Sequence, residues 1–157
     1  MVALLNLFNN DFKDFIESLN KFDVAYILIG GYAVVLHGYH RTTGDMDIWV
    51  KATEENYRKL IKAFSFFGLP TNAIRLDQFL NSDRYEVFSF GRPPMAIDIV
   101  TAIQGVEFDD AYPSVKIVKI QNIEVKLINI SDLIKTKKAS GRYKDLDDLE
   151  NLDFNER

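Results

Sequence analysis

The segment that most constrains the fold of this chain is a glycine pair followed, about fifteen residues later, by two acids. Gly30 and Gly31 end one apolar run, and Asp45 and Asp47 open another. Because successive side chains of a strand point to opposite faces of a sheet, the two acids share one face. Two such carboxylates repel each other unless a cation lies between them, and Mg²⁺ prefers oxygen ligands. Asp-x-Asp pairs are also common in surface loops, but this pair opens a buried strand and therefore predicts a metal site.

A third acid, Asp98, lies in the middle of the apolar run 95–100. Burying an unpaired charge there would cost several kcal/mol, so this carboxyl must be paired, protonated or bound to a metal. A salt bridge to Arg92 or to a lysine is one alternative. If its strand lies beside that of Asp45 and Asp47, three carboxylates converge. Such a cluster suits a two-metal site for phosphoryl displacement.

This pattern resembles the nucleotidyltransferase superfamily related to polymerase β. The fuller string of residues 30–48, with His37, Arg41 and Thr43 between the glycines and the acids, is similar to a subgroup of small bacterial and archaeal proteins. That subgroup includes stand-alone nucleotidyltransferases and the nucleotidyltransferase-like toxins of abortive-infection systems. The resemblance covers residues 24–152. It implies an α/β fold with a mixed sheet flanked by helices and with the acids at one sheet end.

The resemblance also implies roles for individual residues. Asp45 and Asp47 match the metal-binding pair, and Asp98 matches a further metal-binding acid that helps to deprotonate the attacking hydroxyl. The implied cofactor is Mg²⁺, or Mn²⁺ in its place. Gly30 and Gly31 match the turn where the backbone approaches the nucleoside triphosphate, and glycine admits such an approach. Many relatives carry Gly-Ser, so phosphate binding here would depend on backbone donors and on basic residues elsewhere.

Two basic residues are candidates for that task. Arg41 precedes the first acid by four residues, and we expect it to pair with the acids or with a phosphate. Lys137 flanks the apolar face of a helix predicted over residues 131–140, whereas Lys135 and Lys138 face solvent. In the resembling family a lysine at the Lys137 position contacts the triphosphate. The alternative is that a lysine near the end of a helix only stabilises the helix dipole.

Residues 144–149 match a Lys-Asp-x-x-Asp motif of the toxin-like relatives. Leucines at every third position predict a short amphipathic helix there without any function. We expect Asp147 and Asp148 on its solvated face, and Asp145 is left open as a functional residue. His37 is expected to be a hydrogen-bonded packing residue. With two histidines and no cysteine, a zinc site of the usual kinds is disfavoured.

The resemblance implies a single nucleotidyltransferase domain, residues 1–157, with a core of about 24–128 and C-terminal helices over 131–152. Hydrophobic periodicity predicts the elements within it. Strands are expected over 24–29, 46–50, 85–90, 96–100, 115–120 and 123–128, and helices over 8–19, from 32, and over 54–67. Residues 85–90 and 96–100 are predicted to pair antiparallel across 91–94, and Gln121-Asn122 to turn a hairpin. Thr53 and Gly68 are expected to cap a helix, and Ser131 and Gly141 another. The helices are expected to cover one main face of the sheet.

Composition agrees with a compact enzyme. Of 157 residues, 47% are hydrophobic, which is enough for a core, and no run is long enough to span a membrane. The first residues do not form a signal peptide, and the absence of cysteine fits the cytoplasm. A net charge of −4 argues against a general nucleic-acid coat but allows a local patch that binds RNA.

The expected function is metal-dependent transfer of a nucleoside monophosphate from an NTP to a hydroxyl acceptor, with release of pyrophosphate. The acceptor could be a small molecule, an RNA 3′ end or a protein side chain. One alternative is a non-catalytic nucleotide-binding module of a toxin–antitoxin pair, with a toxin or antitoxin as its partner. Another is a metal-dependent phosphodiesterase or nuclease, which has no need of the Gly-Gly turn.

Overall fold

The computed structural model describes residues 10–39, 43–81, 87–91 and 96–156 of the chain. Within these ranges the strands are β1 (Tyr26–Ile29), β2 (Met46–Val50), β3 (Val87–Phe90), β4 (Ile97–Val100), β5 (Lys116–Ile120) and β6 (Ile123–Leu127). The helices are α2 (Asn10–Lys21), α3 (Gly30–Leu36), α4 (Glu54–Phe67), α5 (Leu76–Phe79), α6 (Phe108–Ala111), α7 (Ile130–Ser140) and α8 (Tyr143–Glu156), with a 3-10 turn η1 (Tyr112–Ser114). The expected mixed α/β fold is confirmed.

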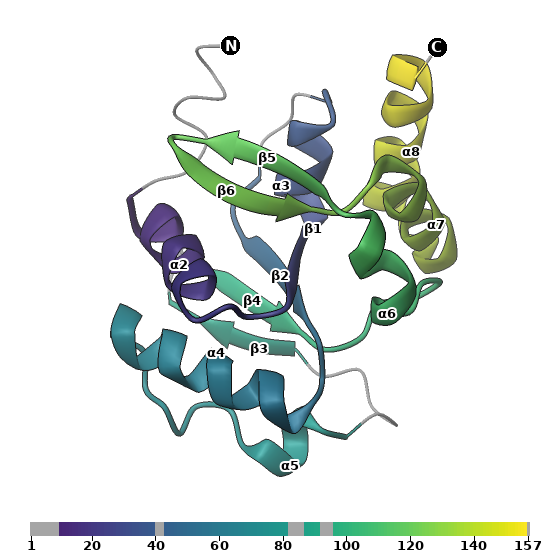
Figure 1. The fold of residues 1–157 in the computed structure, drawn as a ribbon. Coiled ribbons are helices and arrows are strands. Elements are labelled where there is room, and N and C mark those ends of the chain that lie inside the picture. Colours follow the sequence, from purple (N-terminus) through teal and green to yellow (C-terminus); the bar gives the residue numbers. More distant parts are fainter. Residues whose placement is uncertain (1–9, 40–42, 82–86, 92–95, 157) are drawn as a thin grey trace.

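The strands form one sheet in the order β3-β4-β2-β1-β6-β5 (Figure 1). Strand β2 lies between β1, which runs antiparallel to it, and β4, which runs parallel to it. The predicted antiparallel pairing of β3 with β4 is confirmed, although the connection that was expected to turn between them lies partly outside the described residues. The sheet thus places β2 and β4, the two acid-bearing strands, side by side.

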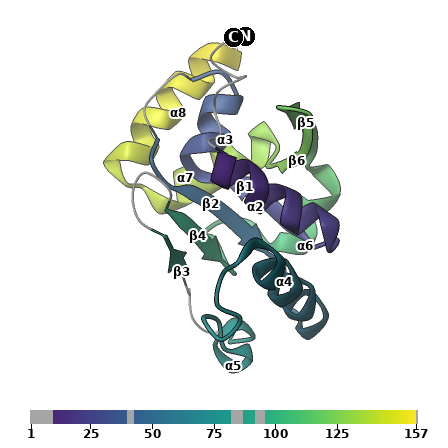
Figure 2. The ribbon, with the colours of Figure 1, turned by 90° about the vertical axis from the view of Figure 1, so that its left-hand side faces the viewer.

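Helices cover both faces of this sheet, so the expectation of one main helical face is wrong (Figures 1 and 2). On one face, Phe64 of α4 packs against Phe90 of β3 with ring centroids 5.0 Å apart. On the other, Phe108 of α6 packs edge-on against Trp49 of β2 at 5.1 Å. The short α6 was not predicted, because four residues carry no sequence period long enough to indicate a helix.

The boundaries of the helices follow from their caps. Thr53 accepts a hydrogen bond from the backbone N–H of Asn56, and Gly68 ends α4 in a left-handed conformation, both as predicted. Helix α7 begins one residue before the predicted cap. Its N-cap is Asn129, not Ser131, because the Asn129 side chain already accepts from the N–H of Asp132 at 2.8 Å. The predicted left-handed end at Gly141 is confirmed.

The predicted β5–β6 hairpin is also confirmed. Gln121 and Asn122 adopt φ values of 53° and 68°, the pair of left-handed residues that a two-residue hairpin turn requires. This turn lies at the outer edge of the sheet, far along the strand order from β3 and β4. The hairpin therefore extends the sheet without contributing to the acid-bearing end.

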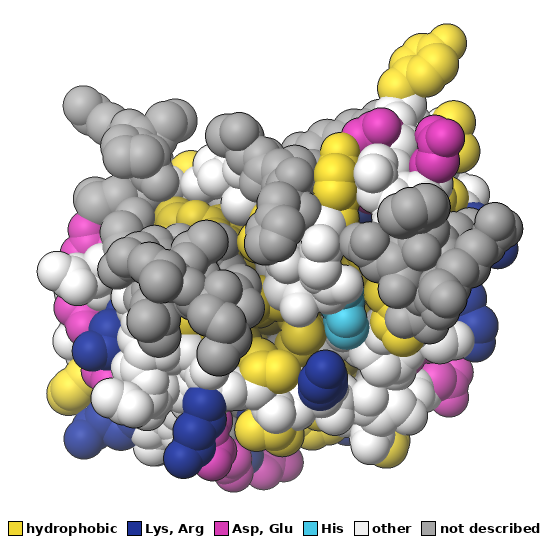
Figure 3. All heavy atoms as spheres, turned by 90° about the horizontal axis from the view of Figure 1, so that it is seen from above, with side chains coloured by type: hydrophobic (Ala, Val, Ile, Leu, Met, Phe, Trp, Pro, Cys, Tyr) yellow, Lys and Arg dark blue, Asp and Glu magenta, His cyan; other side chains and the backbone are white. Residues whose placement is uncertain are grey.

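The molecular surface carries mixed charge on the face seen in Figure 3. On the part of that face that is not grey, Lys and Arg side chains lie interspersed with Asp and Glu. No broad area of one sign covers the described part of this face. Within the described ranges, none of the helices combines the length and the apolar character needed to cross a bilayer.

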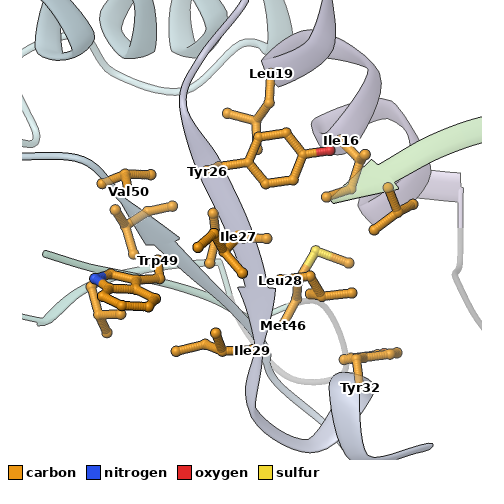
Figure 4. Close-up of a cluster of buried hydrophobic side chains, with 14 of the residues drawn as sticks. Ile16, Leu19, Tyr26, Ile27, Leu28, Ile29, Tyr32, Met46, Trp49 and Val50 are labelled. Carbon is orange, nitrogen blue, oxygen red and sulfur yellow. The ribbon is translucent and has the colours of Figure 1, made fainter. Parts of the chain in front are cut away.

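The core lies on both sides of β1, whose four residues are all buried. Tyr26 and Leu28 point toward Ile16 and Leu19 of α2, whereas Ile27 points to the other side with Trp49 (Figure 4). This alternation is the period-two pattern of a strand covered on both faces. It fixes the register of the sheet, and with it the face on which the acids lie.

Candidate active site

Asp47 and Asp98 lie directly opposite each other on the parallel strands β2 and β4. Each is the second residue of its strand, so both carboxylates lie at the same end of the sheet. Both side chains are half-buried, while their neighbours along each strand are buried in the core. The Asp98 strand thus lies beside the Asp-x-Asp strand, which is the condition stated for the acids to converge.

Gly30 makes room for Asp47. The last residue of β1, Ile29, pairs with Asp47, so the next residue passes directly beside the Asp47 side chain. A Cβ atom at Gly30 would lie 2.8 Å from the Asp47 Cγ, closer than real contacts allow, and the Gly30 φ of 73° also disfavours any other residue. Helix α3 begins at Gly30 itself rather than near residue 32 as expected. The glycine pair is therefore the first turn of this helix.

A cleft of about 780 Å³ opens above these acids. One wall comes from the end of the sheet and the adjoining loop, with Gly30, Gly31, Asp45, Asp47 and Asp98. The opposite wall comes from α7 and the start of α8, with Lys137, Ser140, Arg142 and Asp145. The cleft lining thus combines the carboxylates at the sheet end with two cations from the helical side, which also carries Asp145. It has room for a ligand with both metal-binding and anionic groups.

The carboxylates of this wall fit a magnesium ion that is shared with a ligand. Within the described residues, no group of three or more His, Cys, Asp or Glu is arranged so as to hold a metal ion by itself. The predicted convergence of three carboxylates on one point is thus looser than expected: Asp45, Asp47 and Asp98 line the same cleft without closing a protein-only cage. Mg²⁺ usually takes one or two carboxylates and completes its shell with water and substrate phosphates. The oxygen donors and the open cleft suit that mode.

Asp45 is exposed at the mouth of the cleft, and its charge reaches Tyr32 in the first turns of α3. Burial, with a smaller contribution from the Asp45 carboxylate, raises the pKa of Tyr32 to about 12. Tyr32 also packs edge-on against Phe12 of α2, at a centroid distance of 5.5 Å. The tyrosine therefore remains neutral at physiological pH.

Lys137 is buried and held between two carboxylates of α8. Its Nζ lies 2.9 Å from Asp145 Oδ1 and 3.2 Å from Asp148 Oδ2. Asp145 and Asp148 lie three positions apart on α8 and so share one face of that helix. The tight turn at Gly141 folds this face back onto α7. The expectation that Lys137 flanks the apolar face of α7 is confirmed, and the predicted solvent exposure of Asp148 is wrong, because α7 covers it.

Asp145 also accepts hydrogen bonds from Ser140 Oγ and, at 2.8 Å, from Arg142 Nε. Burial alone would raise the pKa of Asp145, but the hydrogen bonds from Ser140, Lys137 and Arg142 outweigh it and lower the pKa from 3.8 to about 2. Arg142 is thereby anchored at its Nε, while most of its side chain is exposed on the cleft wall. Asp145 therefore organises both cations of this wall.

A pH-dependent stability follows from Asp145. Because its folded-state pKa is depressed, its contribution is fully present above pH 4 and is lost as the pH falls through about 2. It amounts to about 2 kcal/mol. The difference in unfolding free energy between the wild type and Asp145→Asn should therefore shrink as the pH falls from 5 toward 2, as measured by urea denaturation. Asp147→Asn is the control, since Asp147 is exposed. A difference that stays constant with pH would contradict the depressed pKa.

The remaining predicted residues are placed as follows. Arg41 lies outside the described residues. Gly31 lines the cleft, and Lys135 and Lys138 reach solvent as predicted. His37 Nε2 lies 2.7 Å from the Ile128 carbonyl oxygen, which confirms its packing role.

Sequence reasoning missed two residues of the site. Arg142 was not predicted as a site residue, although its position three residues before Asp145 is a signal for an ion pair. Ser89 on β3 donates a hydrogen bond to Asp98 Oδ1 at 2.7 Å. It was missed because a serine in an alternating strand carries no distinguishing signal.

The chain belongs to a family of nucleotidyltransferases. The sequence model of the family described as "Nucleotidyltransferase of unknown function (DUF6036)" matches residues 4–157. The resemblance drawn from the Gly-Gly and Asp-x-Asp pattern is thereby confirmed.

Solved structures show the same fold. A protein from Thermotoga maritima, provisionally described as a nucleotidyltransferase, is 14% identical with a TM-score of 0.61, over 93% of this chain and 91% of that chain. The lincosamide antibiotic adenylyltransferase LnuA, with lincomycin bound, is 17% identical with a TM-score of 0.53, over 93% of this chain and 96% of that chain. At these identities the likeness concerns the fold. No curated protein matches the chain.

Proposed function

We propose that the protein transfers a nucleoside monophosphate from an NTP to a hydroxyl acceptor in a Mg²⁺-dependent reaction that releases pyrophosphate. The observation that carries this proposal is the cleft, whose lining combines Asp47 and Asp98 from the sheet with Lys137 from α7 and Arg142 from the α7–α8 turn. A Mg–NTP complex has the matching polarity, with a cation on one side and phosphate oxygens on the other. Mn²⁺ could take the place of Mg²⁺, because it accepts the same oxygen ligands.

Several residues that line the cleft have a part in the proposed reaction. Asp45 and Asp47 would hold the metal, which when bound neutralises charge on the triphosphate and its leaving group. Gly30 and Gly31 bring the backbone of the first α3 turn to the cleft without a side chain between it and the nucleotide. Arg142 is suited to a planar, bidentate contact with phosphate oxygens.

Lys137 would act on the triphosphate mainly by long-range electrostatic attraction rather than by a direct hydrogen bond. Its ammonium lies on the cleft wall but already contacts two carboxylates. Asp145 shapes this wall as a positioning residue by holding Lys137 and Arg142 in place.

Asp98 would accept the proton of the attacking hydroxyl. Its carboxylate faces the cleft and lies one strand away from Asp47, so a hydroxyl beside Asp98 is also beside the metal-binding pair. A general base must lie within hydrogen-bond reach of the proton that it removes. The acceptor oxygen then bonds to the α-phosphorus, and the bond between that phosphorus and the β-phosphate bridging oxygen breaks.

The fate of a label on the α- or the γ-phosphate of the NTP distinguishes nucleotidyl transfer from phosphoryl transfer. We propose incubation of the protein with α-labelled or γ-labelled NTPs and three acceptor classes: tRNA, small antibiotics such as aminoglycosides and lincosamides, and proteins. LnuA, an adenylyltransferase solved with lincomycin, motivates the lincosamides. The expected result is transfer of the α label to one acceptor and recovery of the γ label in pyrophosphate. Transfer of the γ label would indicate a phosphotransferase, and cleavage of nucleic acid without NTP would indicate a nuclease.

Membership of a toxin–antitoxin pair stays a prediction from the resemblance.

The variant Asp98→Asn tests the role of the base. It should lower turnover by about a hundred-fold or more, the usual contribution of a general base, while NTP binding stays nearly unchanged. Calorimetric titration with a non-hydrolysable NTP measures the binding part. If NTP affinity is lost completely, Asp98 serves nucleotide and metal binding rather than activation of the acceptor.

A further inference from the structure

Ser89 occupies the position that an acceptor hydroxyl would need. It lies directly opposite Asp98 in the antiparallel β3–β4 pair, as Asp47 does on the other side of Asp98. The three residues form one row across β3, β4 and β2. Val87, two residues before Ser89 and hence on the same face of β3, lines the cleft. The Ser89 side chain is therefore on the cleft side of the sheet.

The Ser89 hydroxyl is already engaged as a proton donor. Its Oγ lies 2.7 Å from Asp98 Oδ1, and an ionised carboxylate only accepts, so the serine proton is directed at Asp98. This distance is within the 2.6–3.2 Å reach of a general base and its substrate hydroxyl. Ser89 is exposed, so water could satisfy both groups and the hydrogen bond is not required to bury either of them. The pair has the arrangement of a serine nucleophile beside its base.

We infer that the protein nucleotidylates itself on Ser89, an activity that rests on the proposed function and uses the same cleft. Asp98 takes the Ser89 proton as Ser89 Oγ bonds to the α-phosphorus of the bound NTP. The bond from that phosphorus to the β-phosphate bridging oxygen breaks, and pyrophosphate leaves. The product is a phosphodiester that joins the serine to the nucleoside. The nucleotide then lies beside Asp98, where a second acceptor would have to enter, so labelling should stop at a single monophosphate per chain.

The test is incubation of the full chain with Mg²⁺ and each α-labelled NTP, without any added acceptor. Intact-mass spectrometry should show the gain of a single nucleoside monophosphate, and peptide mapping of the wild type should place it on Ser89. Ser89→Ala should lose the label. Ser65→Ala, which removes an exposed serine of α4 on the opposite face of the sheet, is the control and should keep it. Because mapping is done on the wild type, the assignment does not depend on the folding of the Ser89 variant.

Calorimetric titration of the wild type with a non-hydrolysable NTP and Mg²⁺, run in parallel, separates this inference from the proposed function. Saturable binding together with an unlabelled Ser89 would overturn self-nucleotidylation and leave the proposed function standing. Absence of Mg–NTP binding would overturn both. A label that maps elsewhere, or that persists in Ser89→Ala, would exclude Ser89 as the acceptor.

Discussion

Asp47→Asn is expected to lower Mg²⁺-dependent nucleotide transfer by about a thousand-fold or more. In the proposed reaction this carboxylate holds the metal, which supplies several kcal/mol of transition-state stabilisation, and each 1.4 kcal/mol corresponds to about a factor of ten. Asparagine keeps the shape of the side chain beside Gly30, so the packing at this point survives. Transfer of an α-labelled NTP to the acceptor found in the screen is the measurement.

The same variant should fold as well as the wild type or slightly better when no metal is present. Asp47 and Asp98 lie opposite each other, and loss of one charge relieves their repulsion. Urea denaturation in the presence of a chelator measures this part. Asp77→Asn on α5 is the control, because that acid is exposed and outside the cleft lining. A transfer rate equal to the wild type in Asp47→Asn would refute the metal assignment.

Lys137→Ala is expected to destabilise the fold by about 3–5 kcal/mol, the cost of removing one partner of a buried ion pair. Asp145 and Asp148 are both buried, and both contact the Lys137 ammonium. Without the lysine, the like charges of these two α8 carboxylates would no longer be offset by a cation between them, although Asp145 would keep its hydrogen bonds from Ser140 and Arg142. The free energy of unfolding from urea denaturation is the measurement.

Two further variants make that prediction specific. Lys138→Ala should change stability by less than about 0.5 kcal/mol, because Lys138 is exposed on the same turn of α7. Adding Asp145→Asn and Asp148→Asn to Lys137→Ala should recover part of the loss, since the repelling charges are then gone. If Lys137→Ala unfolds like Lys138→Ala and only NTP affinity falls, the lysine is a phosphate ligand and not a structural cation.

The acid-bearing end of the sheet was predictable because its signals are local. Successive side chains of a strand over residues 46–50 point to opposite faces, so the sequence placed Asp47 on the face opposite Met46 and Ile48. The apolar residues around Asp98 indicated that this acid lies on a buried strand. Glycine is required at position 30 because the Asp47 side chain lies beside it in the folded protein. The requirement could still be recognised in the sequence, because it appears there as a glycine pair.

The helical wall was predicted less well, since its contacts depend on how two helices pack. The sequence pattern of an acid that recurs every three residues is the same whether the acid faces water or packs against another helix. Only the Gly141 turn decides that Asp148 meets Lys137. Ser89 depends likewise on the β3–β4 register, which no residue within β3 specifies.

The most direct test of the proposed function is calorimetric titration of a non-hydrolysable NTP into the wild type, with Mg²⁺ or with a chelator. The cleft predicts saturable binding that requires Mg²⁺ and that Asp45→Asn and Asp47→Asn both weaken, because the metal joins the acid wall to the phosphates. Equal affinity with and without Mg²⁺, or no saturable binding at all, would contradict a metal-dependent nucleotidyltransferase site.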